Sequence, residues 1–192
     1  MAKKNKDISS SNLIKVKPIT EGQKSVFETW KQGKNQFLFG CAGTGKTFIS
    51  LYLAMQDVLN LQTKYEKVIL VRSLIPTREI GFLPGDEEDK AALYQVPYQN
   101  MVKFMFEQPN EQAFNMLYDR LKSQGSLYFL STSFLRGLTF DNSIIIVDEC
   151  QNLNFHELDT ITTRVGQDSK IIYCGDFSQT DLLKQNERNG LH

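Results

Sequence analysis

Short, continuous apolar runs alternate along this chain with longer segments in which apolar residues recur every three or four positions. Five of the short segments predict buried strands: "QFLF", "KVILV", "SLYFLS", "NSIIIVDE" and "KIIYCGD". Between the first two lies "KTFISLYLAMQDVLNL", in which Phe48, Leu51, Met55 and Val58 form one apolar helix face. Strands with continuous apolar runs, rather than alternating ones, are typical of a parallel sheet with helices on both faces. The pattern therefore predicts an α/β fold.

Two shorter helices are predicted outside that unit. In "ITEGQKSVFETWKQG", Thr20 is positioned to cap the helix, and Val26, Phe27 and Trp30 share its apolar side. The second helix, "NFHELDTITTRVG", lies between the last two strands. The residues expected to share its face are Phe155, Leu158, Thr162 and Val165.

Two parts of the chain depart from the strand–helix repeat. Residues from about 86 to 123 look mostly helical, which predicts a helical insertion after the second strand, and "RSLIPTREIGFLPGD" before it is expected to be a loop. Residues 1–12 are polar and lack periodicity, so they are expected to form a disordered tail. The remainder, residues 13–192, has the length of one domain with its own core.

A glycine-rich stretch follows the first strand directly. Residues 40–47 read "GCAGTGKT", which matches the phosphate-loop pattern G-x-x-x-x-G-K-[ST]. Glycines let backbone N–H groups point inward at phosphates, Lys46 would reach the outer phosphates, and Thr47 would offer its hydroxyl to Mg²⁺. A plain glycine turn is the alternative, but both flanks fit a nucleotide site. The residues expected to bind ATP are Gly40, Cys41, Ala42, Gly43, Thr44, Gly45, Lys46, Thr47 and Phe48.

An acid pair, Asp148 and Glu149, follows the fourth predicted strand. Because the carboxyl ends of parallel strands lie at one edge of a sheet, both acids are expected to share that edge with the phosphate loop. Asp148 is then suited to hold Mg²⁺ opposite Thr47, and Glu149 to deprotonate the attacking water. Two exposed acids that cap a strand end are the alternative. A carboxylate aimed at water favours hydrolysis over phosphate transfer.

The last predicted strand ends in "YCGDFSQTD". The amide of Gln179 both donates and accepts hydrogen bonds, so it can bridge a γ-phosphate oxygen and the attacking water. Loss of that phosphate would change the loop, which predicts a nucleotide-dependent switch. The alternative is a turn in which Asp176 or Ser178 caps a helix.

Composition narrows the class of protein. Of 192 residues 41% are hydrophobic, which is ordinary for a globular chain, and no apolar stretch reaches the ~20 residues of a membrane helix. No signal-peptide pattern is present. Lys plus Arg equals Asp plus Glu, 22 each, so the net charge is neutral on polyanion binding and any nucleic-acid site must come from local clustering of charge. Cys41, Cys150 and Cys174 fit no metal-ligand spacing, which predicts reduced thiols in a cytoplasm.

The phosphate loop, "DECQ" and "GDFSQ", in that order, resemble the N-terminal motor domain of superfamily 1 helicases. The blocks "TREIGFLPGD", "SFLRGLTFDNSIIIVDECQN", "TRVGQDSK" and "CGDFSQTDL" resemble more closely the PhoH-like ATPases of bacteria and their phages. That resemblance implies a RecA-like core, Mg²⁺-dependent ATP hydrolysis, a homo-hexameric ring, a link to RNA and a cytoplasmic location in a bacterium or phage-infected host. It also matches Gln23 to a glutamine that reads the adenine edge; a surface glutamine is the alternative.

A helicase needs two RecA-like lobes and this chain has room for one, so a neighbouring subunit is expected to supply an arginine to the phosphate charge. The candidates are Arg164, which could instead stabilise a helix C-terminus, and Arg136. For RNA or single-stranded DNA, the loop after the second strand offers Arg72, Thr77 and Arg78, in the region that contacts the strand in helicases. Solvated arginines are the alternative there.

Three classes of function stay open on the sequence. The first is an ATPase that moves along or remodels RNA or another single strand, and the second is an ATP-controlled oligomeric switch or adaptor without translocation. The third, a nucleotide or small-molecule kinase, is disfavoured by Glu149 and by the lack of a recognisable acceptor site. Tyr94, Tyr98 and Phe104 are expected on the apolar side of the inserted helices rather than in a binding surface.

Overall fold

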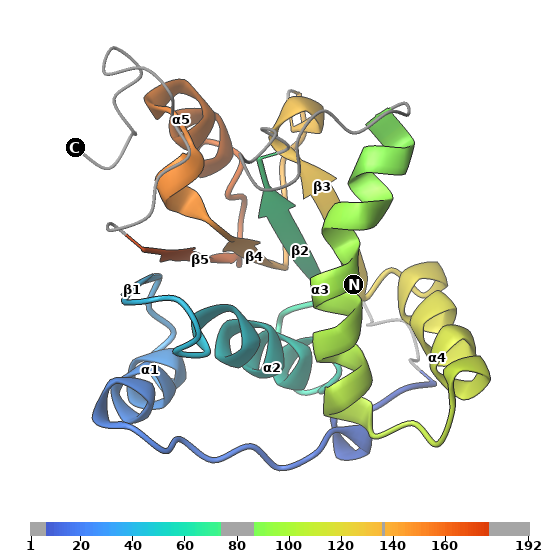
Figure 1. The fold of residues 1–192 in the computed structure, drawn as a ribbon. Coiled ribbons are helices and arrows are strands. Elements are labelled where there is room, and N and C mark those ends of the chain that lie inside the picture. The colour runs from blue at the N-terminus through green and yellow to red at the C-terminus, as the bar shows by residue number, and fades with distance from the viewer. Residues whose placement is uncertain (1–6, 74–86, 136, 177–192) are drawn as a thin grey trace.

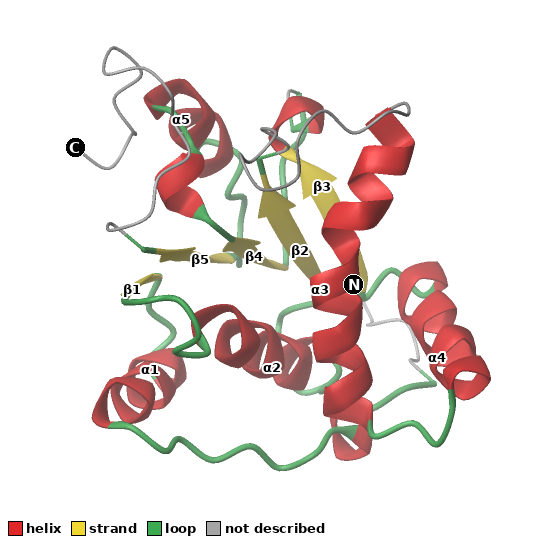
Figure 2. Cartoon of the chain, viewed as in Figure 1, coloured by secondary structure: helices red, strands yellow, loops and turns green. Residues whose placement is uncertain are grey.

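The computed structural model describes residues 7–73, 87–135 and 137–176. Within them, five strands form one sheet in the order β1-β5-β4-β2-β3, and every paired neighbour is parallel. Figure 2 shows the strands in yellow between the helices. Their bounds are β1 Gln36–Phe39, β2 Lys67–Arg72, β3 Leu127–Ser131, β4 Ser143–Val147 and β5 Lys170–Gly175. All five predicted strands are confirmed.

Helices cover both faces of this sheet, as predicted. Figure 1 shows α1 and α2 on one side and α5 on the other. The helices are α1 Glu21–Lys31, α2 Lys46–Val58, α3 Glu87–Phe106, α4 Glu111–Ser123 and α5 Phe155–Thr162. Three short 3₁₀ turns are η1 Ser10–Asn12, η2 Thr132–Phe134 and η3 Cys150–Asn152. Helices α3 and α4 lie between β2 and β3 in the chain and form the predicted helical insertion.

Side-chain caps begin three of the helices. Thr20 accepts a hydrogen bond from the N–H of Gln23 at α1, as predicted, and Asn110 does the same for Ala113 at α4. At α5, Asn154 and Glu157 form a reciprocal capping box, in which each side chain accepts from the other residue's backbone N–H. Each cap satisfies a backbone N–H group of the first turn, which has no partner within the helix.

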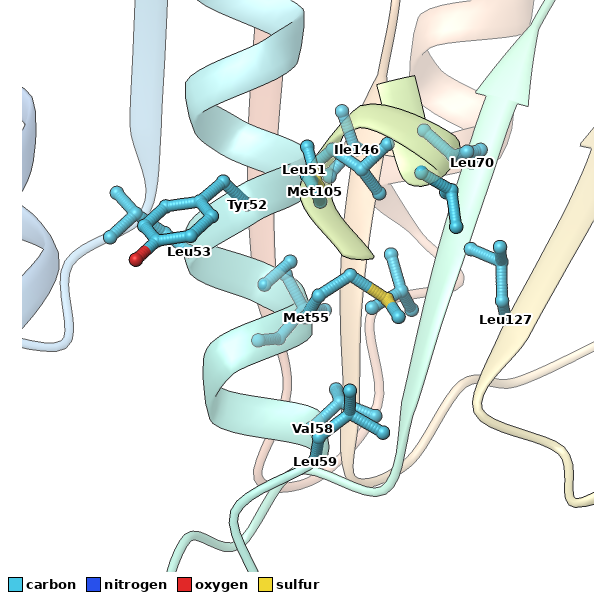
Figure 3. Close-up of a cluster of buried hydrophobic side chains, with 14 of the residues drawn as sticks. Leu51, Tyr52, Leu53, Met55, Val58, Leu59, Leu70, Met105, Leu127 and Ile146 are labelled. Atoms are coloured by element: carbon cyan, nitrogen blue, oxygen red, sulfur yellow. The ribbon is translucent and has the colours of Figure 1, made fainter. Parts of the chain in front are cut away.

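Two apolar clusters hold the layers together, one on each face of the sheet. The larger is built around α2, and Figure 3 shows Leu51, Met55 and Val58 pointing toward Leu70 and Ile146 of the strands. The smaller cluster packs α5 and the β4–α5 connection against alternate residues of the same strands, Ile69, Val71, Ile145, Val147, Ile171 and Tyr173. Because successive residues of a strand point to opposite faces, continuous apolar strands supply both clusters.

Helix α2 is buried more completely than a single apolar face predicts. Tyr52, Leu53 and Ala54 are also buried, because η1 and α1 cover the side of α2 that faces away from the sheet. The Tyr52 hydroxyl accepts from the N–H of Val16, which ties the N-terminal segment to this helix. A helix enclosed in this way holds its N-terminal end, where the phosphate loop enters it, in a fixed position.

Three expectations from the sequence differ from the structure. Residues 1–6 lie outside the described part, but Ile8, within the predicted tail, is buried in the larger cluster next to η1. Strand β1 is an edge strand, because it pairs with β5 alone among the described strands, and its Phe37 is 51% exposed. In α5 the inward residues are Leu158 and Ile161, while Phe155 is exposed, since the helix is turned to pack on the sheet through those two.

No helix among the described residues is long and apolar enough to cross a bilayer.

Candidate nucleotide-binding site

The phosphate loop connects β1 to α2. Gly43 (φ 76°) and Gly45 (φ 82°) have left-handed backbone conformations, which glycine adopts without the steric cost other residues carry. Gly45 is also the N-cap of α2, so the loop runs directly into the first turn of that helix. Free N–H groups and the positive end of the helix dipole both favour an anion at this point. The local sequence therefore folds into the phosphate cradle that its pattern predicts.

Lys46 lies over the inside of this loop. Its ammonium group donates to the carbonyl oxygens of Gly40 (2.7 Å) and Cys41 (2.8 Å). The Thr44 hydroxyl also donates to the Cys41 carbonyl, at 2.9 Å, and closes the curve. The positive charge is thus held at the mouth of the loop, where phosphate oxygens are its natural alternative partners.

Thr47 and Asp148 meet at the same edge of the sheet. The Thr47 hydroxyl donates to Oδ1 of Asp148 at 2.6 Å, although the two residues are 101 positions apart in sequence. Both are oxygen ligands, which Mg²⁺ prefers, and Mg²⁺ is usually held by one or two carboxylates together with waters and phosphate oxygens. No cage of three or more His, Cys, Asp or Glu side chains exists in the described part of the chain. The pair therefore fits a magnesium ion that arrives with its nucleotide.

The second oxygen of Asp148 is bonded to the insertion. Tyr98 of α3, 2% exposed, donates its hydroxyl hydrogen to Oδ2 of Asp148 at 2.7 Å. Burial raises the pKa of Tyr98 well above its usual value and the Asp148 charge raises it further, so the hydroxyl keeps its proton. Both carboxylate oxygens of Asp148 are thus satisfied by hydroxyl donors, one from each side.

Glu149 begins a chain of hydrogen bonds that returns to the phosphate loop. Its carboxylate Oε2 accepts from the side-chain amide of Gln151, and Oε1 of that amide accepts from the N–H of Asp176 at 3.0 Å. Oδ2 of Asp176 then accepts from the N–H of Ala42 at 3.1 Å. Glu149 itself has a left-handed backbone (φ 51°), which is uncommon for a residue with a side chain and is concentrated at functional positions.

Close packing behind this network requires a glycine at 175. A methyl group there would lie 2.6 Å from Sγ of Cys150 and 3.0 Å from Oε1 of Gln151. Burial raises the pKa of the Cys150 thiol to about 12, and burial also raises the pKa of Cys174. Both cysteines are therefore neutral packing residues, whereas Cys41 in the phosphate loop is exposed.

Cavities lie on both sides of the phosphate loop. The phosphate-side cavity, about 240 Å³, is lined by Lys46, Thr47, Asp148, Glu149, Asp176 and, from α3, Met101. The α1-side cavity, about 420 Å³, is lined among others by Gln23, Val26, Phe39, Thr44 and Ile49. Lys46 lines both cavities, so they meet at the phosphate loop.

Gln23 lies at the α1 side of the loop. Its amide nitrogen donates to the carbonyl of Thr44 at 3.3 Å, and its Oε1 accepts from the N–H of Ile19 at 2.8 Å. Phe48, in the first turn of α2, lines the phosphate-side cavity and packs edge-on against Phe104 at 5.7 Å between ring centroids. Both predicted nucleotide-binding residues thus border the loop.

The two predicted arginines within the described residues, Arg72 and Arg164, line neither cavity. The guanidinium group of Arg72 lies 5.3 Å from the ring centroid of Tyr94 and near Tyr98, so it faces the insertion. Arg164 follows α5, and its carbonyl accepts from Phe140 shortly before β4 begins, at the edge of the sheet opposite the phosphate loop. Its buried Nε has no hydrogen-bond partner. Four further predicted residues lie outside the described part of the chain: Thr77, Arg78, Arg136 and Gln179.

Four residues at this site were not predicted as site residues: Tyr98, Met101, Gln151 and Asp176. Gln151 and Asp176 stand inside the motifs "DECQ" and "GDFSQ", so their proximity to the acid pair and to the last strand was an available signal. Tyr98 and Met101 gave no such signal, because an aromatic or a methionine in an apolar helix is first of all a core residue.

These features together define the class of protein. A parallel sheet with a phosphate loop after β1, an acid pair after β4, and β5 between those two strands is the arrangement of a RecA-like P-loop NTPase. Residues 15–192 match the family model described as PhoH-like protein. The chain belongs to this PhoH-like family, which confirms the resemblance carried by the motifs.

Relatives agree with this assignment. Protein PhoH2 of Bacillus subtilis (strain 168) is 34% identical over 145 residues, which are 75% of this chain and 32% of that protein. A PhoH-like protein of Synechocystis is 36% identical over 147 residues, 76% of this chain and 42% of its own length. A PhoH-like protein of Bacillus subtilis is 33% identical over 172 residues, 89% and 50%. The chain thus spans from about a third to a half of these relatives.

Solved structures give more distant likenesses. The Pif1 helicase from Candida albicans has a TM-score of 0.42 at 20% identity and covers 92% of this chain with 36% of its own. The Pif1 helicase from Bacteroides, solved with ADP-AlF3 and single-stranded DNA, has a TM-score of 0.40 at 18% identity, with 92% and 36% covered. The family assignment rests on the sequence match and not on these likenesses.

Proposed function

We propose that this protein hydrolyses ATP with the help of Mg²⁺ and couples that reaction to the binding or remodelling of RNA or another single strand. The supporting observation is the 2.6 Å contact between Thr47 and Asp148, with Lys46 and Glu149 at the same mouth of the loop. The residues proposed to contact the phosphates, hold the metal and activate the water, Lys46, Thr47, Asp148 and Glu149, all line one cavity.

Each residue of this cavity has a defined task in the proposed reaction. Lys46 exchanges its carbonyl partners for outer phosphate oxygens, and Thr47 and Asp148 hold the metal. When bound, Mg²⁺ neutralises charge that develops on the phosphate oxygens. Glu149 accepts the proton of the attacking water at Oε1, because Gln151 donates to Oε2 and orients the carboxylate.

The reaction itself is an in-line displacement. The water oxygen forms a bond to the γ-phosphorus, and the bond from that phosphorus to the bridging oxygen of ADP breaks. The base of the nucleotide is assigned to the α1-side cavity, where the Gln23 amide has both a donor and an acceptor to offer an adenine edge.

A second subunit is proposed to complete the site, in a homo-oligomeric ring. Arg164 lies at the sheet edge opposite its own phosphate loop, so it can act as the arginine finger of a neighbour and not of its own subunit. Mixing supplies the test: Lys46→Ala and Arg164→Ala subunits, each inactive alone, regain turnover together if the arginine acts across an interface. Particle mass in solution with Mg-ATP gives the ring size, and a strict monomer that still turns over ATP rapidly contradicts the ring.

A polar hollow supports the nucleic-acid half of the proposal. About 370 Å³ in volume, it lies at the carboxyl edge of the sheet between η2 and α5 and is lined by Thr132, Ser133, His156, Glu157 and Thr160. Hydroxyl and imidazole groups of this kind bind sugar and phosphate oxygens of a strand without reading its sequence.

ATP turnover with and without single-stranded RNA or DNA tests the whole proposal. Strong stimulation by a single strand, reduced by Thr160→Ala and not by the exposed α1 variant Glu28→Gln, is the expected result. Turnover that stays low and ignores every strand favours the ATP-controlled switch or adaptor instead. Phosphate that appears on an acceptor rather than in water identifies a kinase and overturns the hydrolase.

A further inference from the structure

The insertion reaches the nucleotide site through one face of α3. Successive turns of this face carry Tyr98, Met101 and Phe104, and each contacts a different part of the site. Tyr98 bonds Asp148, Met101 lines the phosphate-side cavity, and Phe104 packs on Phe48. Helix α3 is therefore a wall of the nucleotide site.

The environment of Tyr98 leaves its hydroxyl little freedom. Its ring packs against Phe129 of β3 at 5.7 Å between centroids, within the larger apolar cluster. The hydroxyl donates to Oδ2 of Asp148, and the charged side chain of Arg72, at the end of β2, lies near it. A buried carboxylate needs such donors, because removing its hydration without replacement is costly. The ring thus fixes the hydroxyl, and the hydroxyl fixes one oxygen of the carboxylate.

The two carboxylate oxygens of Asp148 have different partners. Oδ1 faces Thr47, its partner in the proposed metal site, and Oδ2 faces Tyr98. Rotation of the carboxylate about its Cβ–Cγ bond would break both contacts at once. A hydrogen bond to the oxygen on the far side of a ligating carboxylate orients the ligand and raises metal affinity.

We propose that Tyr98 is a positioning residue of the magnesium site, which holds Asp148 in the orientation that binds the metal and so makes the helical insertion part of the nucleotide-binding machinery. The proposal rests on the proposed Mg²⁺ role of Asp148. Tyr98 does not touch the nucleotide, and its effect passes through the carboxylate alone.

Tyr98→Phe removes the hydroxyl and keeps the ring, so it isolates this hydrogen bond. We expect the concentration of Mg²⁺ that half-saturates ADP binding, measured by calorimetry over a series of Mg²⁺ concentrations, to rise on the order of 10-fold or more. ADP binding in EDTA stays as in the unmodified protein. Tyr118→Phe is the matched control, since Tyr118 is a buried tyrosine of the same insertion that contacts Phe114 and Gln99 and not the site.

A structural role alone predicts a different pattern. If Tyr98 served packing only, Tyr98→Phe would lower the unfolding temperature without changing the Mg²⁺ requirement, and that outcome overturns the proposal. Should Tyr98→Phe not fold, 3-fluorotyrosine placed at position 98 keeps the question open to measurement: its ¹⁹F signal should shift when Mg²⁺ joins bound ADP. An unchanged signal contradicts the inference.

The two proposals can fail separately. If the unmodified protein binds ADP no more tightly with Mg²⁺ than in EDTA, the metal site at Thr47 and Asp148 is wrong, and Tyr98 loses its role with it. If Mg²⁺ tightens ADP binding equally in the unmodified protein and in Tyr98→Phe, the metal site stands and the role of Tyr98 is wrong.

Discussion

The two sides of the phosphate loop are built in different ways. On the phosphate side, the contacts join residues far apart in the chain: Thr47 to Asp148 across 101 positions, and Ala42 to Asp176 across 134. On the α1 side, Gln23 reaches Thr44 across 21 positions, within one helix–strand–loop unit. One side depends on how the whole sheet is assembled, and the other on local structure.

We therefore expect the phosphate side to control the reaction and the α1 side to control which base binds. The phosphate side holds the two acids, the proposed metal ligands and the charge of Lys46, so substitutions there should change both ATP turnover and the stability of the fold. The α1 side offers the amide of Gln23 among hydroxyl and apolar side chains, so substitutions there should change which base is bound.

Glu149→Gln tests the base on the phosphate side. Turnover should fall by about 10²–10⁴-fold, because a neutral amide cannot take the proton of the attacking water. Nucleotide binding should remain, since Gln keeps the size and the hydrogen bond of the side chain. Single-turnover phosphate release and ATP binding by calorimetry measure the two quantities, with Glu28→Gln on α1 as the control. Unchanged turnover removes Glu149 as the base.

Gly175→Ala tests the packing that holds the phosphate side together. The added methyl group collides with Cys150 and Gln151, so the free energy of unfolding should fall by roughly 1–3 kcal/mol. Thermal unfolding gives the measurement. Gly22→Ala is the control: its new methyl group meets nothing closer than 4.0 Å, and it lies on a helix, so it should stabilise slightly. Cys150→Ala added to Gly175→Ala should recover part of the loss; no recovery means that the clash lies elsewhere.

Gln23→Ala tests the α1 side. Loss of one hydrogen bond to the base should weaken ATP binding about 5- to 10-fold, close to 1 kcal/mol, and narrow the preference for ATP over GTP. Turnover at saturating ATP should change little, in contrast to Glu149→Gln. Competition between the two nucleotides is the measurement, with exposed Gln32→Ala as control. If selectivity does not move, Gln23 is a loop-supporting glutamine that bonds Thr44 and Ile19.

Cysteine labelling separates the loop from the packing behind it. At pH 8 iodoacetamide should modify Cys41 and spare Cys150 and Cys174, because burial raises the pKa of both and leaves almost no thiolate, which is the reactive form. Peptide mass spectrometry reads the outcome. Mg-ADP should slow the modification of Cys41; labelling at an equal rate would place the nucleotide away from the loop.

Much of the fold could be predicted from residue patterns. The strand "NSIIIVDE" and the loop "GCAGTGKT" were identifiable because a run of apolar residues and a run of glycines each constrain their own backbone. The edge position of β1 was not identifiable: "QFLF" is apolar enough for a central strand, and its Phe37 finds cover by stacking on Tyr173 at 4.4 Å between centroids. Strand pairing depends on contacts between residues far apart in sequence, so the local residue pattern does not predict it.

The candidate site shows the same contrast between features set by the local sequence and features set by distant residues. Lys46, Thr47, Asp148 and Glu149 were predicted from motifs, and the structure brings them to one cavity. The direction of Arg72 was not predicted: its guanidinium group lies over the ring of Tyr94, which α3 of the insertion supplies. The sequence alone does not show which neighbouring residue a loop arginine contacts.

The chain's own order of residues determines that a phosphate loop forms and that an acid pair ends a buried strand, since both follow from contacts among residues close in sequence. Which carboxylate oxygen meets Thr47, which tyrosine holds the other, and that Asp176 bonds Ala42 were decided only by the tertiary structure. Those contacts depend on placing β5 between β1 and β4 and on folding α3 across the sheet edge. All elements of the core are buried together, so the position of each one depends on how all the others pack.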